Sequence, residues 1–433
     1  MEVNGCHFNL TDSVPRVPAP KPLRIAWLGG APYETGGAPG VATELLDGLA
    51  RLGHEIDCFF PSAKREVPER LAAHDNLTFT WGTSEWRWNR WYSRTKIAAF
   101  ASGLLARAIA SVRLRQEVVR RHAQRPYDLI YQNQTIESLG VPASVTKSVP
   151  LVIRPDSHQA GELRWLWRER RLAFRCQPPY IFFVVVAITS FRALVQAIKI
   201  RPASLLICIS SVFRDHIVHD YRFPLEKTVV VTNPVKLDRF ASSERPLSDP
   251  PIVLVPSRIS MRKGIEDIVA VAQLLHERGV HARVRVVGGP SIWSDYRKLL
   301  EDLPRENSEY AGDVRYKDMP AELERADVVL LASKYDPCPM TVLEALASGV
   351  PVVATNEVGS IEDIDRSVAA EVALGDIAGL ATAVEEMLER LRRNPAGTRA
   401  LARAEAERRF APDVVCRQIS TALERLVHGS TAG

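Results

Sequence analysis

The chain has 433 residues, more than the roughly 250–300 residues at which a single hydrophobic core usually stops growing, so two domains are expected. Its apolar fraction of 46% and charged fraction of 25% are typical of soluble globular proteins and exclude a disordered or fibrous class. The 56 basic and 51 acidic residues are evenly mixed, so a net charge of +5 gives no indication of nucleic acid as a partner.

The N-terminal segment, residues 1–21, is predicted to be a flexible tail. It lacks the basic start and the apolar run of a secretory signal. The six cysteines of the chain form no C-x-x-C pair and have no zinc-type spacing to histidine, which indicates a reducing compartment. Together these features predict a cytoplasmic protein.

The first half of the chain, residues 22–240, is predicted to form a Rossmann-like domain. A buried strand at Leu23–Gly30 is followed by a Gly-rich loop, by a helix with an apolar face at Val41–Leu52, and by a strand at Glu55–Phe60. This order is typical of a doubly wound sheet. Four later apolar runs are predicted to be further parallel strands: Leu129–Tyr131, Leu151–Ile153, Leu205–Ile209 and Val229–Val231.

Two clusters of aromatic and basic residues lie in this half: Trp81, Trp86, Arg87, Trp88, Arg90, Trp91 and Tyr92, and then Arg164, Trp165, Trp167, Arg168, Arg170, Arg171 and Arg175. Trp rings together with cations suit an anionic membrane surface, so contact with the inner face of a membrane is expected. Two alternatives are tryptophans that pack long helices and tryptophans that stack on an acceptor sugar. The apolar run Tyr180–Phe191 has 12 residues where a membrane-spanning helix needs about 20, so a span is not expected.

The second half begins after a polar, Pro-bearing linker at 241–251. Residues 252–408 are predicted to form a second Rossmann-like domain, and residues 409–433 a helix that packs back on the first domain. Helices are expected to begin near Gly264, Pro320 and Val342. The predicted strands of this domain are Ile252–Val255, Arg283–Val287, Val328–Leu331 and Val350–Ala354. The fold class is therefore α/β, with two doubly wound domains that face each other across a cleft.

The first candidate site is the loop Pro256–Gly264, between a strand and the helix that follows it. Arg262 and Lys263 lie at the helix N-terminus, where the partial positive charge of the backbone makes a cation unfavourable by a few tenths to about 1 kcal/mol. An anion bound at that point would make the placement of these two cations favourable. A loop with Arg258, Lys263 and free backbone N–H groups at the edge of a parallel sheet suits a diphosphate. The alternative is a solvated basic loop.

The second candidate site runs from Asp336 to Glu344, after the strand at Val328–Leu331. The backbone N–H groups of Met340, Thr341 and Val342 start a helix and are available to phosphate oxygens. The alternative is a local structural role, in which Glu344 forms a capping box with Thr341 and Asp336 is a turn residue.

The stretch Asp336–Thr355, DPCPMTVLEALASGVPVVAT, resembles the E-x7-E region of glycosyltransferase family 4, whose members are retaining enzymes of the GT-B fold. The resemblance implies that Glu344 contacts the donor ribose and that loop amides hold its phosphate. It also implies that Asp336 contacts the donor sugar. The family has Glu at that position, which is one methylene longer.

Further segments match the same family in the expected order over roughly residues 23–430. Pro256–Arg258 and Lys263–Gly264 resemble its Arg and Lys pair on the donor diphosphate, and Gly36–Gly37 resembles its loop that faces donor phosphates and acceptor. Asn233–Phe240 resembles the segment that closes the first domain.

The family also has a catalytic-site histidine after the strand that matches Leu151–Ile153. This chain has Arg154-Pro-Asp156-Ser-His158 there, so either Asp156 takes the place of the histidine or His158 is shifted by two positions. No residue stands out as a nucleophile. The resemblance thus implies retaining transfer through an ion-pair-like route, assisted by the donor phosphate, with no metal and no cofactor.

The expected partners are a nucleotide-sugar donor and a glycan, lipid-linked or small-molecule acceptor. Two alternatives share the fold: a catalytically inactive scaffold or binding subunit, and another GT-B enzyme such as a sugar phosphorylase. A dinucleotide oxidoreductase is disfavoured because the first loop has no G-x-G-x-x-G sequence.

Overall fold

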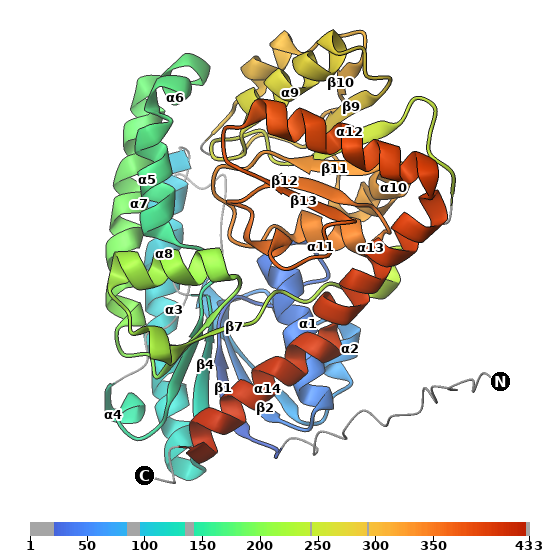
Figure 1. Cartoon of the computed structure of the whole chain (residues 1–433). Coiled ribbons are helices and arrows are strands. Elements are labelled where there is room, and N and C mark those ends of the chain that lie inside the picture. Colours follow the sequence, from blue (N-terminus) through green and yellow to red (C-terminus); the bar gives the residue numbers. More distant parts are fainter. Residues whose placement is uncertain (1–20, 85–95, 135–142, 243–244, 292–293, 430–433) are drawn as a thin grey trace, which may run out of the picture.

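The computed structural model describes residues 21–84, 96–134, 143–242, 245–291 and 294–429. They form two α/β domains, and each domain is built on one sheet whose strands are all paired in parallel (Figure 1). Parallel strands need a crossover between them, and helices supply those crossovers and cover the sheets.

The first domain contains a seven-stranded sheet in the order β3-β2-β1-β4-β5-β6-β7, which is doubly wound around β1. Its strands are β1 (Arg24–Leu28), β2 (Glu55–Ser62), β3 (Leu77–Ser84), β4 (Leu129–Asn133), β5 (Leu151–Arg154), β6 (Leu205–Cys208) and β7 (Thr228–Val230). Its helices are α1 (Ala38–Arg51), α2 (Glu69–Ala72), α3 (Lys96–Gln124), α4 (Ala143–Thr146), α5 (Gln159–Arg168), α6 (Arg170–Cys176), α7 (Pro179–Ile200) and α8 (Ser211–Tyr221), with 3-10 turns at Leu225–Lys227 and Leu237–Arg239.

The second domain contains a six-stranded sheet in the order β10-β9-β8-β11-β12-β13. Its strands are β8 (Ile252–Pro256), β9 (Arg283–Val287), β10 (Ser308–Tyr310), β11 (Val328–Leu331), β12 (Val352–Thr355) and β13 (Ala369–Val372). Its helices are α9 (Ile265–Glu277), α10 (Met319–Arg325), α11 (Met340–Ala347), α12 (Ile377–Arg393) and α13 (Pro395–Phe410), with 3-10 turns at Arg297–Asp302, Tyr316–Asp318 and Gly359–Ile361. The last helix that the structure describes is α14 (Pro412–Gly429).

Three strands, β3, β10 and β13, were not expected from the sequence. Each lies at an edge of its sheet, and each carries half-buried or exposed side chains among its residues. An edge strand is covered less completely than a central one, so it has no continuous apolar run to reveal it.

The apolar run Tyr180–Phe191 is also longer in the structure than its sequence suggests. It belongs to α7, a helix of 22 residues that is long and apolar enough to cross a membrane by length and composition. The expectation that this segment is too short is therefore wrong, because the helix continues through Arg192 and Lys199 to Ile200.

The C-terminal helix α14 lies against α1 of the first domain, as Figure 1 shows. Gly48 of α1 faces Cys416, and a Cβ at Gly48 would lie 2.4 Å from the Cys416 Sγ atom. Further along, the His54 Nε2 atom is 2.8 Å from the Ser420 hydroxyl. The last helix thus joins the chain's end to the domain in which it begins.

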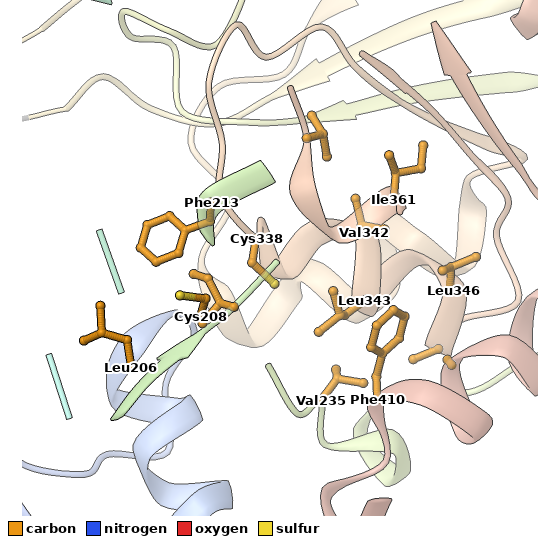
Figure 2. Close-up of a cluster of buried hydrophobic side chains, with 14 of the residues drawn as sticks. Leu206, Cys208, Phe213, Val235, Cys338, Val342, Leu343, Leu346, Ile361 and Phe410 are labelled. Atoms are coloured by element: carbon orange, nitrogen blue, oxygen red, sulfur yellow. The ribbon is translucent and has the colours of Figure 1, made fainter. Parts of the chain in front are cut away.

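A continuous apolar cluster connects the two domains beneath the start of α11. Figure 2 shows its members from both domains: Leu206, Cys208, Phe213, Val235, Cys338, Val342, Leu343, Leu346, Ile361 and Phe410. All of them are buried. This packing fixes the N-terminal end of α11 against the first domain and so sets one side of the space between the domains.

Candidate active site

A cleft of about 930 Å³ lies between the domains, at the carboxyl ends of the strands. Ligands of open α/β sheets bind at this edge, because the loops that follow parallel strands meet there. The first domain contributes the loop after β1, the segment after β5 and one face of α7. The second domain contributes the loops after β8, β9, β10 and β11, together with the start of α11.

Most of the residues predicted from the sequence line this one cleft: Gly36, Gly37, Asp156, Arg258, Lys263, Asp336, Met340, Thr341 and Glu344. Two do not line it. The Val342 side chain is fully buried in the core, and His158 is fully buried beneath α5. The segments far apart in sequence therefore converge on a single space.

The loop between β8 and α9 holds three cations in different environments. The Arg262 backbone has a left-handed φ of 69°, and its N–H donates to the Glu169 carboxylate at 2.9 Å. The Arg262 guanidinium lies 3.3 Å from Glu162, and Lys263 forms an ion pair with Asp336. Arg258 is exposed to the cleft, and its guanidinium has no partner among the residues that the structure describes.

These contacts correct one expectation from the sequence. The cations at the start of α9 are not left uncompensated, because carboxylates of the same chain face them and because Glu266 and Asp267 occupy the first helical turn. Acidic residues at a helix N-terminus offset its positive end. An anionic ligand is thus not needed to explain Arg262, and Arg258 becomes the cation that the loop leaves available.

The start of α11 contrasts with that of α9. Its first turn has no acidic residue, and its N-cap residue is Pro339. The Val342 N–H donates to the Pro339 carbonyl at 3.2 Å, whereas the N–H groups of Met340 and Thr341 have no partner in the described part of the chain. Of the three amides predicted to hold phosphate, those of Met340 and Thr341 are therefore available to a ligand in the cleft.

Glu344 lies on the first turns of α11 and is only 7% exposed. The capping-box alternative is not formed, since no side chain caps this helix. Burial raises the pKa of Glu344 to about 7, with the positive charge of Arg239 acting in the opposite direction. A buried carboxylate that borders an open cleft can accept hydrogen bonds from ligand hydroxyl groups.

Arg239 and Tyr316 lie next to Glu344 and were not identified from the sequence. The Arg239 guanidinium carbon is 3.3 Å from the Tyr316 ring centroid, and the side chain also donates to the Tyr316 carbonyl. A Cβ at Gly36 would lie 2.6 Å from the same ring. With Glu344 they line a pocket of about 530 Å³ beside the cleft. For Arg239, the resemblance of Asn233–Phe240 to a domain-closing segment was the one signal in the sequence.

Asp156 and His158 occupy different environments, although they are two residues apart. Asp156 is exposed and lines the cleft. His158 Nδ1 is 2.8 Å from the Tyr335 hydroxyl, and its Nε2 is 3.3 Å from Asp220. Burial lowers the pKa of His158 to about 3, against the opposing effect of Asp220, so its ring is neutral near pH 7. The structure therefore brings Asp156 to the cleft and places His158 between the domains.

The aromatic and basic clusters are only partly described. Residues 85–95, which include Trp86, Trp88 and Trp91, lie outside the described residues. Trp81 packs against Phe60, with ring centroids 5.1 Å apart. In the second cluster, Trp167 is 45% exposed and Arg164 forms an ion pair with Asp220. The structure also describes no group of three or more His, Cys, Asp or Glu residues that could hold a metal ion.

Two family models match the chain. Residues 35–239 match the model described as Glycosyltransferase Family 4, and residues 250–390 match the model described as Glycosyl transferases group 1. The two matches correspond to the two domains, and every predicted residue of the cleft lies within one of them.

Individual relatives and solved structures agree with these models. The chain is 28% identical to a glycogen synthase of Mycobacterium tuberculosis over 248 residues, which is 55% of this chain and 57% of that protein. The chain thus spans little more than half the length of such curated relatives. Sucrose-phosphate synthase from Thermosynechococcus elongatus has a TM-score of 0.66 at 17% identity, covering 94% of this chain and 100% of that one. The Anabaena protein HepE, solved with UDP, has a TM-score of 0.62 at 20% identity, covering 93% and 99%.

Proposed function

We propose that this chain, which belongs to glycosyltransferase family 4 and has the GT-B fold, transfers a hexosyl group from a nucleotide sugar to an acceptor with retention of configuration. The observation that carries the proposal concerns Arg258, which has no partner in the described part of the chain, and the start of α11, whose first turn has no acidic residue: both face one cleft. The acceptor is a glycan, a lipid-linked saccharide or a small molecule, and the reaction takes place in the cytoplasm.

The donor diphosphate is assigned to the space between Arg258, Lys263 and the start of α11. Each phosphate of the donor carries a negative charge on its non-bridging oxygens, and the guanidinium of Arg258 and the amides of Met340 and Thr341 are donors without partners among the described residues. Lys263 would exchange its ion pair with Asp336 for one with phosphate, leaving that carboxylate to accept from a sugar hydroxyl. HepE, which shares this fold, was solved with UDP and with UDP-glucose, and this supports a nucleotide-sugar donor.

The nucleoside of the donor is assigned to the pocket beside Glu344. A ribose carries two vicinal hydroxyl groups, and one carboxylate can accept from both. Such bonds favour the ionised form of Glu344, so donor binding would lower the raised pKa of this group.

In the proposed reaction the bond between the anomeric carbon and the phosphate oxygen breaks while a bond to the acceptor oxygen forms on the same face of the sugar. The acceptor proton passes to the departing phosphate oxygen. Arg258 and Lys263 stabilise the charge on the leaving nucleoside diphosphate, which is the main contribution of such a site to the rate. Asp156, on the opposite domain, faces the positive charge that develops on the sugar. Neither a metal ion nor a cofactor has a role in this scheme.

The direct test replaces the free cation. Arg258→Ala should reduce donor turnover about 100-fold or more, as expected for the loss of one preorganised donor at a developing charge. Arg305→Ala is the matched control, because Arg305 is exposed and does not line the cleft. UDP-, GDP- and ADP-sugars are screened by thermal shift and by hydrolysis. Donor stabilisation without turnover in the wild type would favour the scaffold alternative, and no effect of Arg258→Ala would refute the assignment of the diphosphate site.

A further inference from the structure

The outward side of α7 carries large apolar residues that the protein leaves uncovered. Tyr180, Phe183, Phe191, Leu194 and Ile198 are between 56% and 67% exposed. Their spacing of 3, 8, 3 and 4 residues places them along one face of the helix. We refer to these five residues as the outer face of α7.

The inward side of the same helix mixes apolar and polar residues, since its buried positions are Phe182, Val185, Thr189, Gln196 and Ile200. Gln196 is fully buried there, and its side-chain carbonyl accepts from the Gln159 N–H at 2.8 Å and from the Tyr221 hydroxyl at 2.6 Å. Its amide donates to the Ser157 carbonyl at 2.6 Å. Thr189 is likewise buried. A surface helix that folds only for water carries polar residues on its exposed side, whereas α7 has large apolar residues there, so its outer face is suited to an apolar environment.

A second helix of the same domain has exposed apolar residues as well. Leu105, Ile109 and Val112 of α3 are more than half exposed. Arg115 of α3 lies close enough to Lys199 of α7 that its positive charge, after burial, lowers the pKa of Lys199. Exposed apolar side chains therefore extend beyond a single helix.

The chain segment that contains α6 and α7 carries charges of one sign, although Arg175 of α6 lies 3.7 Å from Asp302 of the second domain. No Asp or Glu occurs in the sequence between Glu169 and Asp215. The same stretch contains Arg170, Arg171, Arg175, Arg192, Lys199, Arg201 and Arg214. The α6 arginines precede the outer face, and Lys199 and Arg201 follow its last residue. Cations near an anionic lipid surface favour binding, so the positive charge of this segment is complementary to such a surface.

The position of α7 in the fold decides its orientation. Its inner face lines the cleft through Val185, Thr189 and Arg192, and the chain continues directly from its end into β6 of the first sheet. A helix with one side committed to a protein cleft cannot be surrounded by lipid, although its length and composition would permit a span. An apolar face flanked by cations instead suits a helix that lies in the plane of a membrane interface.

We propose that the outer face of α7 docks on an anionic lipid bilayer, with the helix parallel to the surface and with the arginines of α6 at the headgroups. Aromatic side chains at Tyr180, Phe183 and Phe191 suit the depth of that interface. The outer face does not line the cleft, so docking does not depend on the proposed transfer reaction.

Vesicle binding of the whole chain tests the proposal. Wild-type protein should co-sediment with vesicles of phosphatidylcholine containing 30% phosphatidylglycerol and should bind pure phosphatidylcholine vesicles at least tenfold more weakly. The double variant Phe183→Gln, Leu194→Gln should bind the anionic vesicles at least tenfold more weakly than wild type. Leu225→Gln is the matched control, because Leu225 is 55% exposed but lies elsewhere, and it should bind as wild type.

Two further measurements keep the result unambiguous. Arg170→Gln, Arg171→Gln should weaken binding to the anionic vesicles several-fold without changing the apolar residues. The chain has eight tryptophans of its own, so the emission of Phe191→Trp is measured as its difference from wild type; this added emission should shift to the blue on vesicle addition and should be quenched by brominated lipid. Unchanged binding by the Phe183, Leu194 double variant, or no quenching of Trp at position 191, would overturn the proposal. A dimer that this variant converts to a monomer would also overturn it, since a second copy would then cover the outer face.

Discussion

The N-termini of α9 and α11 face the same cleft but differ in whether acidic side chains offset the partial positive charge of the helix start. At α9, Glu266 and Asp267 occupy the first turn, and the preceding loop is held by Glu162 and Glu169 of the first domain. At α11 no acidic residue is present in the first turn. The comparison shows that a helix N-terminus becomes a candidate anion site only when the protein's own carboxylates leave it vacant.

The strongest test of this comparison places a carboxylate at the vacant helix start. Thr341→Glu should leave the fold intact and stabilise α11 by about 0.3–1 kcal/mol, because it supplies the missing acidic residue. If the donor screen selects a UDP-sugar, the same charge should weaken UDP binding about 100-fold, since juxtaposed like charges cost several kcal/mol; a GDP- or ADP-sugar donor is tested with its own nucleoside diphosphate. Isothermal titration calorimetry measures the affinity.

The matched change at the other helix is Glu266→Gln. It should leave UDP affinity within about threefold of wild type and lower the stability slightly, because Glu266 compensates α9 and does not line the cleft. If Glu266→Gln weakens UDP binding and Thr341→Glu does not, the two helix starts have been assigned the wrong way round.

The opposite wall of the cleft provides a second test. Asp156→Asn should reduce turnover about 100-fold with little change in UDP affinity, if its carboxylate faces charge that develops during transfer. His158→Gln should retain turnover in the folded fraction and lower the unfolding midpoint, because it disturbs the buried contact with Tyr335, worth about 1 kcal/mol. Steady-state kinetics and thermal unfolding of both variants distinguish the roles, and the reverse result would identify His158 as the functional residue.

The smallest expected effect concerns the pH dependence of Glu344. Its folded-state pKa of about 7 lies above the ordinary value of 4.5, so the folded state binds the proton more tightly than the unfolded state. The stabilisation of the folded state that comes from this tighter proton binding is fully present below pH 4.5 and is lost as the pH rises through 7. Glu344→Gln should therefore raise the unfolding midpoint at pH 8 by a few degrees relative to wild type and change it less at pH 5. Equal shifts at both pH values would contradict the raised pKa.

Much of the donor side could be predicted from the sequence because the relevant residues follow central parallel strands. Arg258 and Lys263 come after β8, and Asp336 and Glu344 after β11, which are adjacent in the sheet. Long apolar runs reveal central strands, and the carboxyl ends of neighbouring parallel strands necessarily meet.

The rest depends on contacts between residues far apart in the chain. The partners of Arg262 are Glu162 and Glu169, about a hundred positions earlier, and no local pattern identifies them. Sequence alone left both Asp156 and His158 as candidates, because the direction of each side chain depends on where α5 begins. The edge strands and the full length of α7 were missed because partial burial and interspersed cations conceal their periodicity.

The two-sided character of α7 has a kinetic consequence. One side of this helix lines the cleft and the other is the proposed contact with lipid, so the catalytic space and the bilayer would be separated by about one helix diameter, roughly 10–12 Å. An acceptor anchored in that bilayer would reach the cleft by diffusing laterally in two dimensions. Its effective concentration would then be a surface density, and turnover would respond to dilution of the acceptor within the membrane at constant bulk concentration.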